Sequence, residues 1–239
     1  MKLAIFDLDH TLMPMDTGDA WVRFLVRESG IDAMPVFAQL DRFASEYHAQ
    51  TLSIEEFEDF QMRFLARFPR GQLDAWRDKF VREWVLAHVP QRSVQLVAKH
   101  TVAGDVTALC SATYSYVTEP IAALFGIDEV LCTRPATDAA GTFLGYLADP
   151  PTYREGKVHK VRDFVRAQAK RGVVFEELVF YSDSLADMPL FEFVADNGGR
   201  CVAVNPSAAL EEVARARAWP CMATFDKSDL ERANAVTNG

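Results

Sequence analysis

The sequence predicts an α/β fold in which a parallel sheet is interrupted by a separate helical segment. Short apolar runs recur along the 239 residues, and each is typical of a strand that is buried on both faces of a parallel sheet. After Pro90, these runs alternate with helical patterns. Between the first run and the second, the chain from Asp16 to about Ala87 has a helical pattern almost throughout and no strand.

The first strand, Leu3 to Phe6, ends in two acids, Asp7 and Asp9, which flank one leucine. In a doubly wound sheet, ligands lie beyond the carboxyl ends of the strands. Two carboxylates this close repel each other and favour a hard cation with oxygen ligands, most often Mg²⁺. The same residues also have a purely structural explanation, because an aspartate after a strand often turns the chain or caps a helix.

Residues 16–87 carry apolar residues at helical spacing, which indicate the core of a small helical bundle rather than a cofactor site. Ser53 followed by Glu56 is a capping box that starts the third helix. The apolar positions are Trp21, Phe24, Leu25, Phe57, Phe60, Phe64, Leu65 and Phe68.

Beyond this segment the pattern predicts further strands and helices in alternation. The expected strands are Val106–Cys110, Glu129–Thr133, Leu178–Tyr181 and Cys201–Val204. The expected helices are Ser93–His100, Thr118–Phe125, Lys157–Lys170 and Ala208–Ala216, with a hairpin turn at Gly141 and a loose polar end after Lys227.

Composition narrows the class of protein. A net charge of −9, a pI near 5.1 and scattered basic residues argue against a nucleic-acid partner. No apolar stretch approaches the roughly 20 residues needed to span a bilayer, and no signal peptide is visible, so we expect a cytoplasmic protein without a membrane partner. Cys110, Cys132, Cys201 and Cys221 form no Cys-x-x-Cys pair and indicate buried thiols. The oligomeric state is not readable from the sequence.

The string Asp7-Leu8-Asp9-His10-Thr11 after an apolar strand resembles the first motif of the haloacid dehalogenase (HAD) superfamily of phosphotransferases. Three further motifs follow in that family's order. The second is Ser111-Ala112-Thr113, directly after a strand, and the third is Lys157 within Tyr153-Arg154-Glu155-Gly156-Lys157. The fourth is Tyr181-Ser182-Asp183-Ser184-Leu185-Ala186-Asp187, which also follows a strand.

Each of these residues suits phosphate chemistry but also has an ordinary structural role. The Ser111 hydroxyl and the amides that follow, beginning with Ala112, can donate to phosphate, although a serine at a strand end commonly caps a helix. Lys157 lies in the first turn of a helix, where a cation is unfavourable unless an anion faces it. The alternative is a solvated surface lysine, and Lys160 is the rival if the register differs.

The resemblance is to the phosphoserine-phosphatase-like subfamily IB, which has an inserted helical cap, but the fourth motif departs from the pattern common in the phosphoserine-phosphatase-like branch. That branch commonly has glycines and an asparagine where this chain has Ser182, Ser184 and Ala186. Both acids are retained, so the departures indicate a different sub-branch. The resemblance implies that Asp183 binds the metal, while Asp187 holds a metal-bound water or steadies Lys157.

The resemblance implies a Rossmann-like HAD core, residues 1–14 and 88–239, with an inserted α-helical cap domain, residues 15–87. It also implies a Mg²⁺-dependent phosphomonoester phosphatase. Asp7, expected to be ionised at pH 7, would attack phosphorus and form an aspartyl-phosphate, and Asp9 would act as acid and then base. Mg²⁺ would be held by Asp7, the Asp9 carbonyl and Asp183, with Ser111 and Lys157 neutralising the phosphoryl oxygens.

The cap residues bear on the substrate. In the phosphoserine-specific branch an acid after the first motif meets the substrate amine and a cap arginine grips its carboxylate. Asp16 falls at the acid's position, whereas Gln61 falls at the position of the arginine. Without that arginine, no guanidinium is left to bind a substrate carboxylate. Asp16, Asp19 and the cap acids therefore favour an amino-alcohol phosphate such as histidinol phosphate, unless these acids are only a solvated face.

Three alternatives to that assignment remain open. A phosphoserine phosphatase is one, and a phosphomutase is a second, because it would keep both acids of the first motif. The third is a noncatalytic HAD module that binds a partner through its cap, although such proteins usually lose one of the four motifs and this chain keeps all of them.

Overall fold

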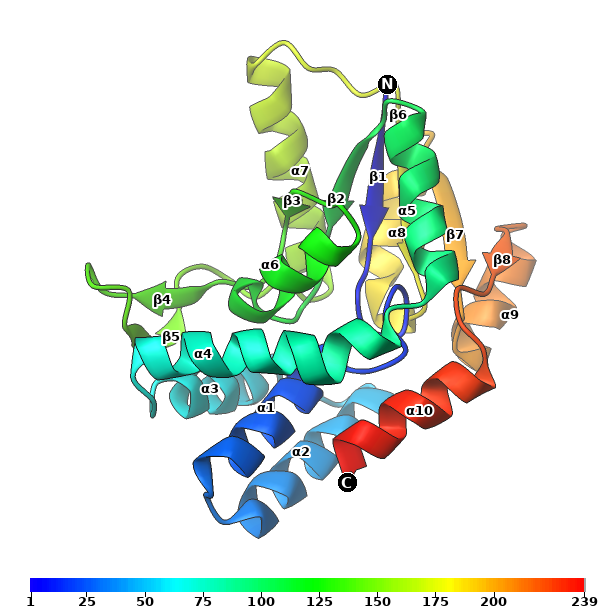
Figure 1. The fold of residues 1–239 in the computed structure, drawn as a ribbon. Helices are drawn as coiled ribbons and strands as arrows, with labels where there is room; N and C mark the ends of the chain where they lie inside the picture. The colour runs from blue at the N-terminus through cyan, green and yellow to red at the C-terminus, as the bar shows by residue number, and fades with distance from the viewer. Residues whose placement is uncertain (239) are drawn as a thin grey trace.

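A computed structural model describes residues 1–238, and its centre is a six-stranded parallel sheet (Figure 1). The strand order is β3-β2-β1-β6-β7-β8. Successive strands run outward from β1 in one direction and from β6 in the other, so the order reverses between these two neighbours. Ligands bind at such reversal points in α/β sheets. The strands are β1 (Lys2–Phe6), β2 (Val106–Leu109), β3 (Glu129–Val130), β6 (Glu177–Ser182), β7 (Arg200–Val204) and β8 (Cys221–Met222).

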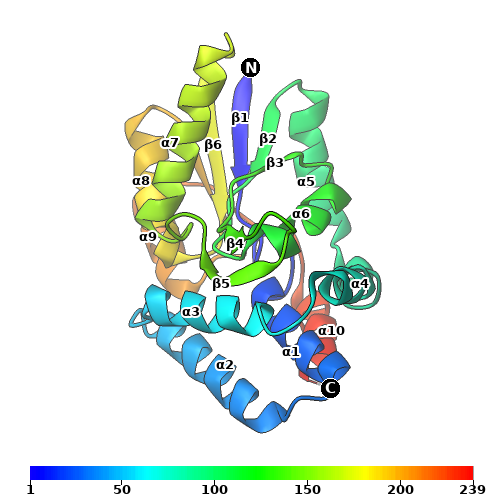
Figure 2. The same cartoon turned by 90° about the vertical axis from the view of Figure 1, so that its left-hand side faces the viewer.

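Helices cover both faces of the sheet (Figure 2). Leu3 and Ile5 of β1 pack with α7 (Glu155–Lys170), α8 (Met188–Asp196) and α9 (Ala208–Ala216). Ala4 and Phe6 point the other way, toward α5 (Gln91–Val102) and α6 (Ser115–Leu124). The strands are mostly apolar because both faces of the sheet are covered, and the predicted α/β class is confirmed.

The helical insert, residues 15–87, lies beyond the carboxyl ends of the strands (Figures 1 and 2). It is helical throughout its main elements, as the sequence predicted, and the Ser53 hydroxyl accepts from the Glu56 amide at 3.3 Å. Trp21, Phe24 and Phe80 are fully buried at its centre. Its helices are α1 (Thr17–Ser29), α2 (Ala33–His48), α3 (Ile54–Leu65) and α4 (Arg70–Phe80), followed by a π-helical turn (Val81–Val85) and a 3-10 turn (Leu86–His88).

The insert does not stand apart from the rest of the chain. One continuous apolar cluster runs from its helices to the α5 and α6 face of the sheet. Helix α3 packs on a small antiparallel hairpin of β4 (Pro135–Thr137) and β5 (Phe143–Leu147), which turns at Gly141 as expected. The division into a core domain and a cap domain therefore stays a proposal.

The prediction of a loose end after Lys227 was wrong. Residues Lys227–Asn238 form α10, which crosses from the sheet to the insert beside α1 (Figure 1). Ala233 is fully buried there. Asp226 and Asp229 exchange backbone-to-side-chain hydrogen bonds in a capping box at the start of this helix, which is the sequence feature that could have revealed it.

Other elements also differ from the expectation. Strand β3 is shorter than the expected Glu129–Thr133 run, and α8 and β8 were not predicted. Cys110, Cys132 and Cys201 are buried as expected, whereas Cys221 is exposed. Within residues 1–238, no helix has both the length and the apolar character to cross a bilayer.

A close backbone approach fixes where α7 begins. Gly156 lies in the first turn of α7, and a Cβ atom there would be 2.0 Å from the carbonyl oxygen of Pro151. The Gly156 amide donates to the Tyr153 carbonyl at 2.8 Å, which closes the preceding turn. Only glycine fits this approach, and the next residue along the helix is Lys157.

We expect Gly156→Ala to lower the free energy of unfolding by about 1–3 kcal/mol, because the added methyl group has no room. Gly71→Ala is the matched control: Gly71 also lies in a first helical turn, in α4, and its Cβ would meet nothing within 4 Å. That variant should be neutral or more stable by up to about 1 kcal/mol. Urea unfolding measures both, and equal stabilities would refute the steric argument.

Candidate active site

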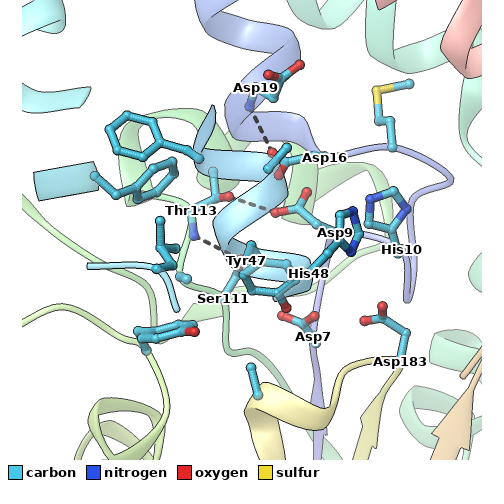
Figure 3. Close-up of a pocket in the computed structure, with 18 of the residues that line it drawn as sticks. Asp7, Asp9, His10, Asp16, Asp19, Tyr47, His48, Ser111, Thr113 and Asp183 are labelled. Carbon is cyan, nitrogen blue, oxygen red and sulfur yellow. Dashed lines mark hydrogen bonds between the residues drawn. The ribbon is translucent and has the colours of Figure 1, made fainter. Parts of the chain in front are cut away.

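One cavity of about 310 Å³ lies where the carboxyl ends of β1, β2 and β6 meet the insert (Figure 3). Asp7 and Asp9 follow β1, Ser111 follows β2 and Asp183 follows β6. The structure thus brings the four motifs together at the reversal point of the sheet. Of the residues singled out in the sequence, the cavity wall includes Asp7, Asp9, Asp16, Asp19, Ser111, Ala112, Lys157, Asp183 and Asp187, but not Gln61.

Lys157 is buried between two carboxylates. Its Nζ donates to Asp7 Oδ1 at 2.9 Å and to Asp187 Oδ2 at 2.7 Å. Burial opposes the charge of Lys157, but Asp187 and Asp7 raise its pKa well above the usual value. Lys157 therefore stays an ammonium. Asp7 and Asp187 are the anionic partners that a cation in the first helical turn requires.

The same burial affects the nucleophile candidate. Burial raises the pKa of Asp7 to about 7; Lys157 opposes that shift, while Asp187 and Asp9 add to it. The sequence alone suggested an Asp7 that is ionised at pH 7. In the folded protein, full ionisation calls for a further cation beside it.

Asp183 is held by Thr11 through a reciprocal pair of hydrogen bonds. The Thr11 hydroxyl donates to Asp183 Oδ1 at 3.0 Å and accepts from the Asp183 amide at 3.0 Å. Burial, Asp7 and Asp187 raise the pKa of Asp183 well above its usual value. Figure 3 shows the carboxylates of Asp7 and Asp183 directed toward one space.

This donor set fits Mg²⁺. Within residues 1–238, no three acidic, histidine or cysteine side chains converge as a closed metal cage. Asp7 and Asp183 supply two carboxylates, and the main-chain carbonyl of Asp9 is the third donor expected from the sequence. Few protein oxygens with several retained waters is the coordination that Mg²⁺ favours. Asp187 instead binds Lys157 and the Ser182 hydroxyl, the latter at 2.6 Å.

Both oxygens of Asp9 are engaged by threonines that sequence reasoning missed. Asp9 Oδ1 accepts from the amide and hydroxyl of Thr17 at 2.8 and 2.6 Å. Asp9 Oδ2 accepts from the Thr113 hydroxyl at 2.7 Å, as Figure 3 shows. A Cβ at Gly18 would lie 3.2 Å from the Thr113 hydroxyl, so a larger residue would crowd this contact. Asp9 is therefore fixed in one orientation, with its carboxylate joining the first and second motifs.

The second and third motifs resolve two structural alternatives. Ser111 does not cap α6, which begins at Ser115; its Oγ instead accepts from the Thr113 amide at 3.1 Å and lines the cavity. Lys160, the rival to Lys157, pairs with Asp149 at 2.8 Å and is not part of the cavity wall.

The helical insert contributes two acids, Asp16 and Asp19, to the cavity wall. Asp16 caps α1 by accepting from the Asp19 amide at 2.8 Å. The Asp16 side chain is exposed to solvent, but protein atoms surround its carboxyl group on most sides. The resulting desolvation and the nearby Asp9 raise the pKa of Asp16. Burial raises the pKa of Asp19 to about 6, and Asp16 adds to the shift. Arg23 binds Asp19 at 2.7 Å and Asp41 at 2.9 Å.

Comparisons with known proteins agree with this site. The haloacid dehalogenase-like hydrolase family matches residues 4–192, and the chain belongs to that family. It is 33% identical to a histidinol-phosphatase of Neisseria meningitidis over 92% of this chain and 98% of that protein. It is 28% identical to a phosphoserine phosphatase of Mycobacterium tuberculosis, over 90% of this chain and 68% of that protein.

Solved structures support the fold. A protein of unknown function from Bordetella pertussis superposes with a TM-score of 0.85 at 36% identity, covering 94% of this chain and 99% of that one. A substrate-bound phosphoserine phosphatase has a TM-score of 0.63 at 17% identity over 92% of each chain, a likeness of fold alone. The predicted HAD-superfamily phosphatase is confirmed in family and enzyme class.

We expect Lys157→Ala to lower kcat/KM by about 100-fold or more, because it removes a buried cation that faces the transferring charge. Lys160→Ala is the matched control and should stay near wild type. Hydrolysis of an aryl phosphate measures both, and circular dichroism checks that each variant is folded. Equal losses in the two variants, or a larger loss in Lys160→Ala, would show that the third motif had been assigned to the wrong lysine.

Proposed function

We propose that this protein hydrolyses a small phosphomonoester with Mg²⁺, through an aspartyl-phosphate formed on Asp7. The observation that carries the proposal is the buried Asp7, bound to Lys157 and facing Asp183 at the floor of the cavity. A carboxylate in this position can attack phosphorus only if its charge is compensated as the anionic substrate approaches.

The residues divide the chemistry between them. Asp7 attacks phosphorus as the bond to the leaving alcohol breaks, and Asp9 donates a proton to the departing oxygen. Asp9 then takes a proton from the water that cleaves the acyl-phosphate. Ser111, the Ala112 amide and Lys157 balance charge on the phosphoryl oxygens, where positioning and electrostatics dominate catalysis.

Asp7, Asp183 and the Asp9 carbonyl would hold Mg²⁺, with Asp187 orienting Lys157 beside it. The ion would supply charge neutralisation between the nucleophile and the phosphate. The raised pKa values of Asp7 and Asp183 support this assignment, because an acid cluster of this kind is relieved by a cation.

We expect turnover of an aryl phosphate to require Mg²⁺ and to stop in EDTA. Asp7→Asn should abolish turnover, because the amide keeps the shape but is not a nucleophile. Asp9→Asn should be slow yet accumulate a phosphorylated protein, detectable by intact-mass spectrometry, since it cannot activate water. Turnover that survives chelation would rule out the metal, and an active Asp7→Asn would rule out the nucleophile.

We infer that residues 15–87 act as a cap that reads the leaving group, with residues 1–14 and 88–239 as the core. The insert supplies Asp16, Asp19 and Arg23 to the cavity. Within the described residues, Arg23 is the only arginine on this wall, and it is already paired with Asp19 and Asp41. A substrate carboxylate would find no free guanidinium there, whereas an amine would find Asp16.

An amino-alcohol phosphate such as histidinol phosphate is therefore our leading substrate, and the name of the Neisseria relative supports it. A phosphoserine phosphatase is the second candidate, favoured by the name of the Mycobacterium relative. A phosphomutase is a further alternative, because it would keep the same two acids of the first motif.

In a panel of phosphomonoesters, we expect amino-alcohol phosphates to rank above phosphoserine, sugar phosphates and nucleotides in kcat/KM. Asp16→Asn should raise KM for the amine substrate but not for an aryl phosphate, since asparagine still caps the helix and only the charge is lost. Asp59→Asn, an exposed acid of α3 outside the cavity wall, is the control. Phosphoserine at the head of the ranking would contradict the substrate assignment.

A further inference from the structure

The last turn of α2 contacts the loop that follows β6. The Tyr47 hydroxyl lies 2.6 Å from Ser184 Oγ, within hydrogen-bond distance. Tyr47 belongs to the helical insert, whereas Ser184 lies between the two acids of the fourth motif. These residues are separated by 137 positions in the chain. The contact therefore joins the insert to the loop that follows β6.

The contact continues as a chain of hydrogen bonds to the nucleophile. The Ser184 amide donates to Ser182 Oγ at 3.2 Å, and the Ser182 hydroxyl donates to Asp187 Oδ2 at 2.6 Å. Asp187 in turn accepts from Lys157, which also donates to Asp7. Every link between Tyr47 and Asp7 is therefore a direct contact between neighbours.

Ser184 also shapes the loop itself. Its Oγ accepts from the Ala186 amide at 3.2 Å and so begins the 3-10 turn, Leu185–Asp187, that carries Asp187. The side chain of Ser184 is 8% exposed, so its hydroxyl has little access to water as an alternative partner. A partner for this hydroxyl from the insert thus stabilises the loop between Asp183 and Asp187.

Tyr47 lies close to the acids as well as to the serine. It lines the cavity, and Figure 3 places its ring above Asp7. Burial raises the pKa of the Tyr47 phenol, and the carboxylates of Asp187, Asp183 and Asp7 add to that shift. Tyr47 is therefore a neutral hydrogen-bonding group over the reaction centre.

We propose that Tyr47 is a positioning residue, which fixes the Asp183–Asp187 loop through Ser184 when the insert covers the site. The insert that covers the cavity thereby also orders the loop that carries these two acids. The kinetic part of this inference rests on the proposed function, whereas the loop contact does not.

The test compares Tyr47→Phe, Ser184→Ala and the double variant. Each single variant should lower kcat/KM for an aryl phosphate about tenfold, the scale of one hydrogen bond, and the double variant should be no worse than either. Tyr146→Phe removes the hydroxyl of an exposed tyrosine on β5 outside the cavity wall and should change nothing. Losses that multiply in the double variant would mean that Tyr47 acts independently of Ser184, which overturns the proposal.

Hydrogen exchange supplies a readout that does not depend on turnover. In the substrate-free protein, Tyr47→Phe should speed exchange of the Ala186 amide, because the hydroxyl that accepts from it loses its own anchor. Unchanged exchange at Ala186 would overturn the proposal, even if activity fell. If exchange rises but no phosphate ester is turned over by the wild-type protein, the proposed function fails and the loop contact stands.

Discussion

The ammonium of Lys157, buried between Asp7 and Asp187, is the interaction on which the site depends. Charges removed from water are costly unless they are paired, and removal of one partner leaves the others uncompensated. β1, β6 and α7 must therefore meet at one point, since each delivers one member of the trio or the loop that carries it. The close approach of Gly156 to Pro151 sets the first turn of α7 and with it the position of Lys157.

Much of the fold could be predicted because each sheet face is covered. Strands packed on both sides are mostly apolar along their length, so β1, β2, β6 and β7 could be predicted from apolar runs in the sequence. Helix α10 was missed, although the Asp226 and Asp229 capping box marks its start. Its apolar face is narrow, with Ala233 buried and Val236 packed at the edge of the core, and its polar residues read as a solvated tail.

The order of the motifs predicted which acids meet at the site, but not their hydrogen-bond partners. Strand ends in a parallel sheet share one edge, so acids that follow β1 and β6 had to converge. Motif order does not predict which side chains these acids contact, even where the partner lies within a quoted motif, as Thr11 and Thr113 do. Thr11 binds Asp183, and Thr17 and Thr113 bind Asp9, yet the spacing of these threonines in the sequence does not indicate these contacts. The same holds for Tyr47, whose contact needs the relative placement of α2 and the loop after β6.

Only some of the acids in the insert are placed to act on a ligand in the cavity. Gln61, aligned with an arginine position, and Glu58, one helical turn before it, are buried behind the cavity wall, where Ile54 and Phe57 take the wall positions. Burial raises the pKa of Glu58 to about 8, so its carboxyl group is largely neutral at pH 7. Asp19 is paired with Arg23. Among the described acids of the insert that line the cavity, Asp16 alone lacks an ion-pair partner, so the proposed recognition of a substrate amine rests on this one carboxylate.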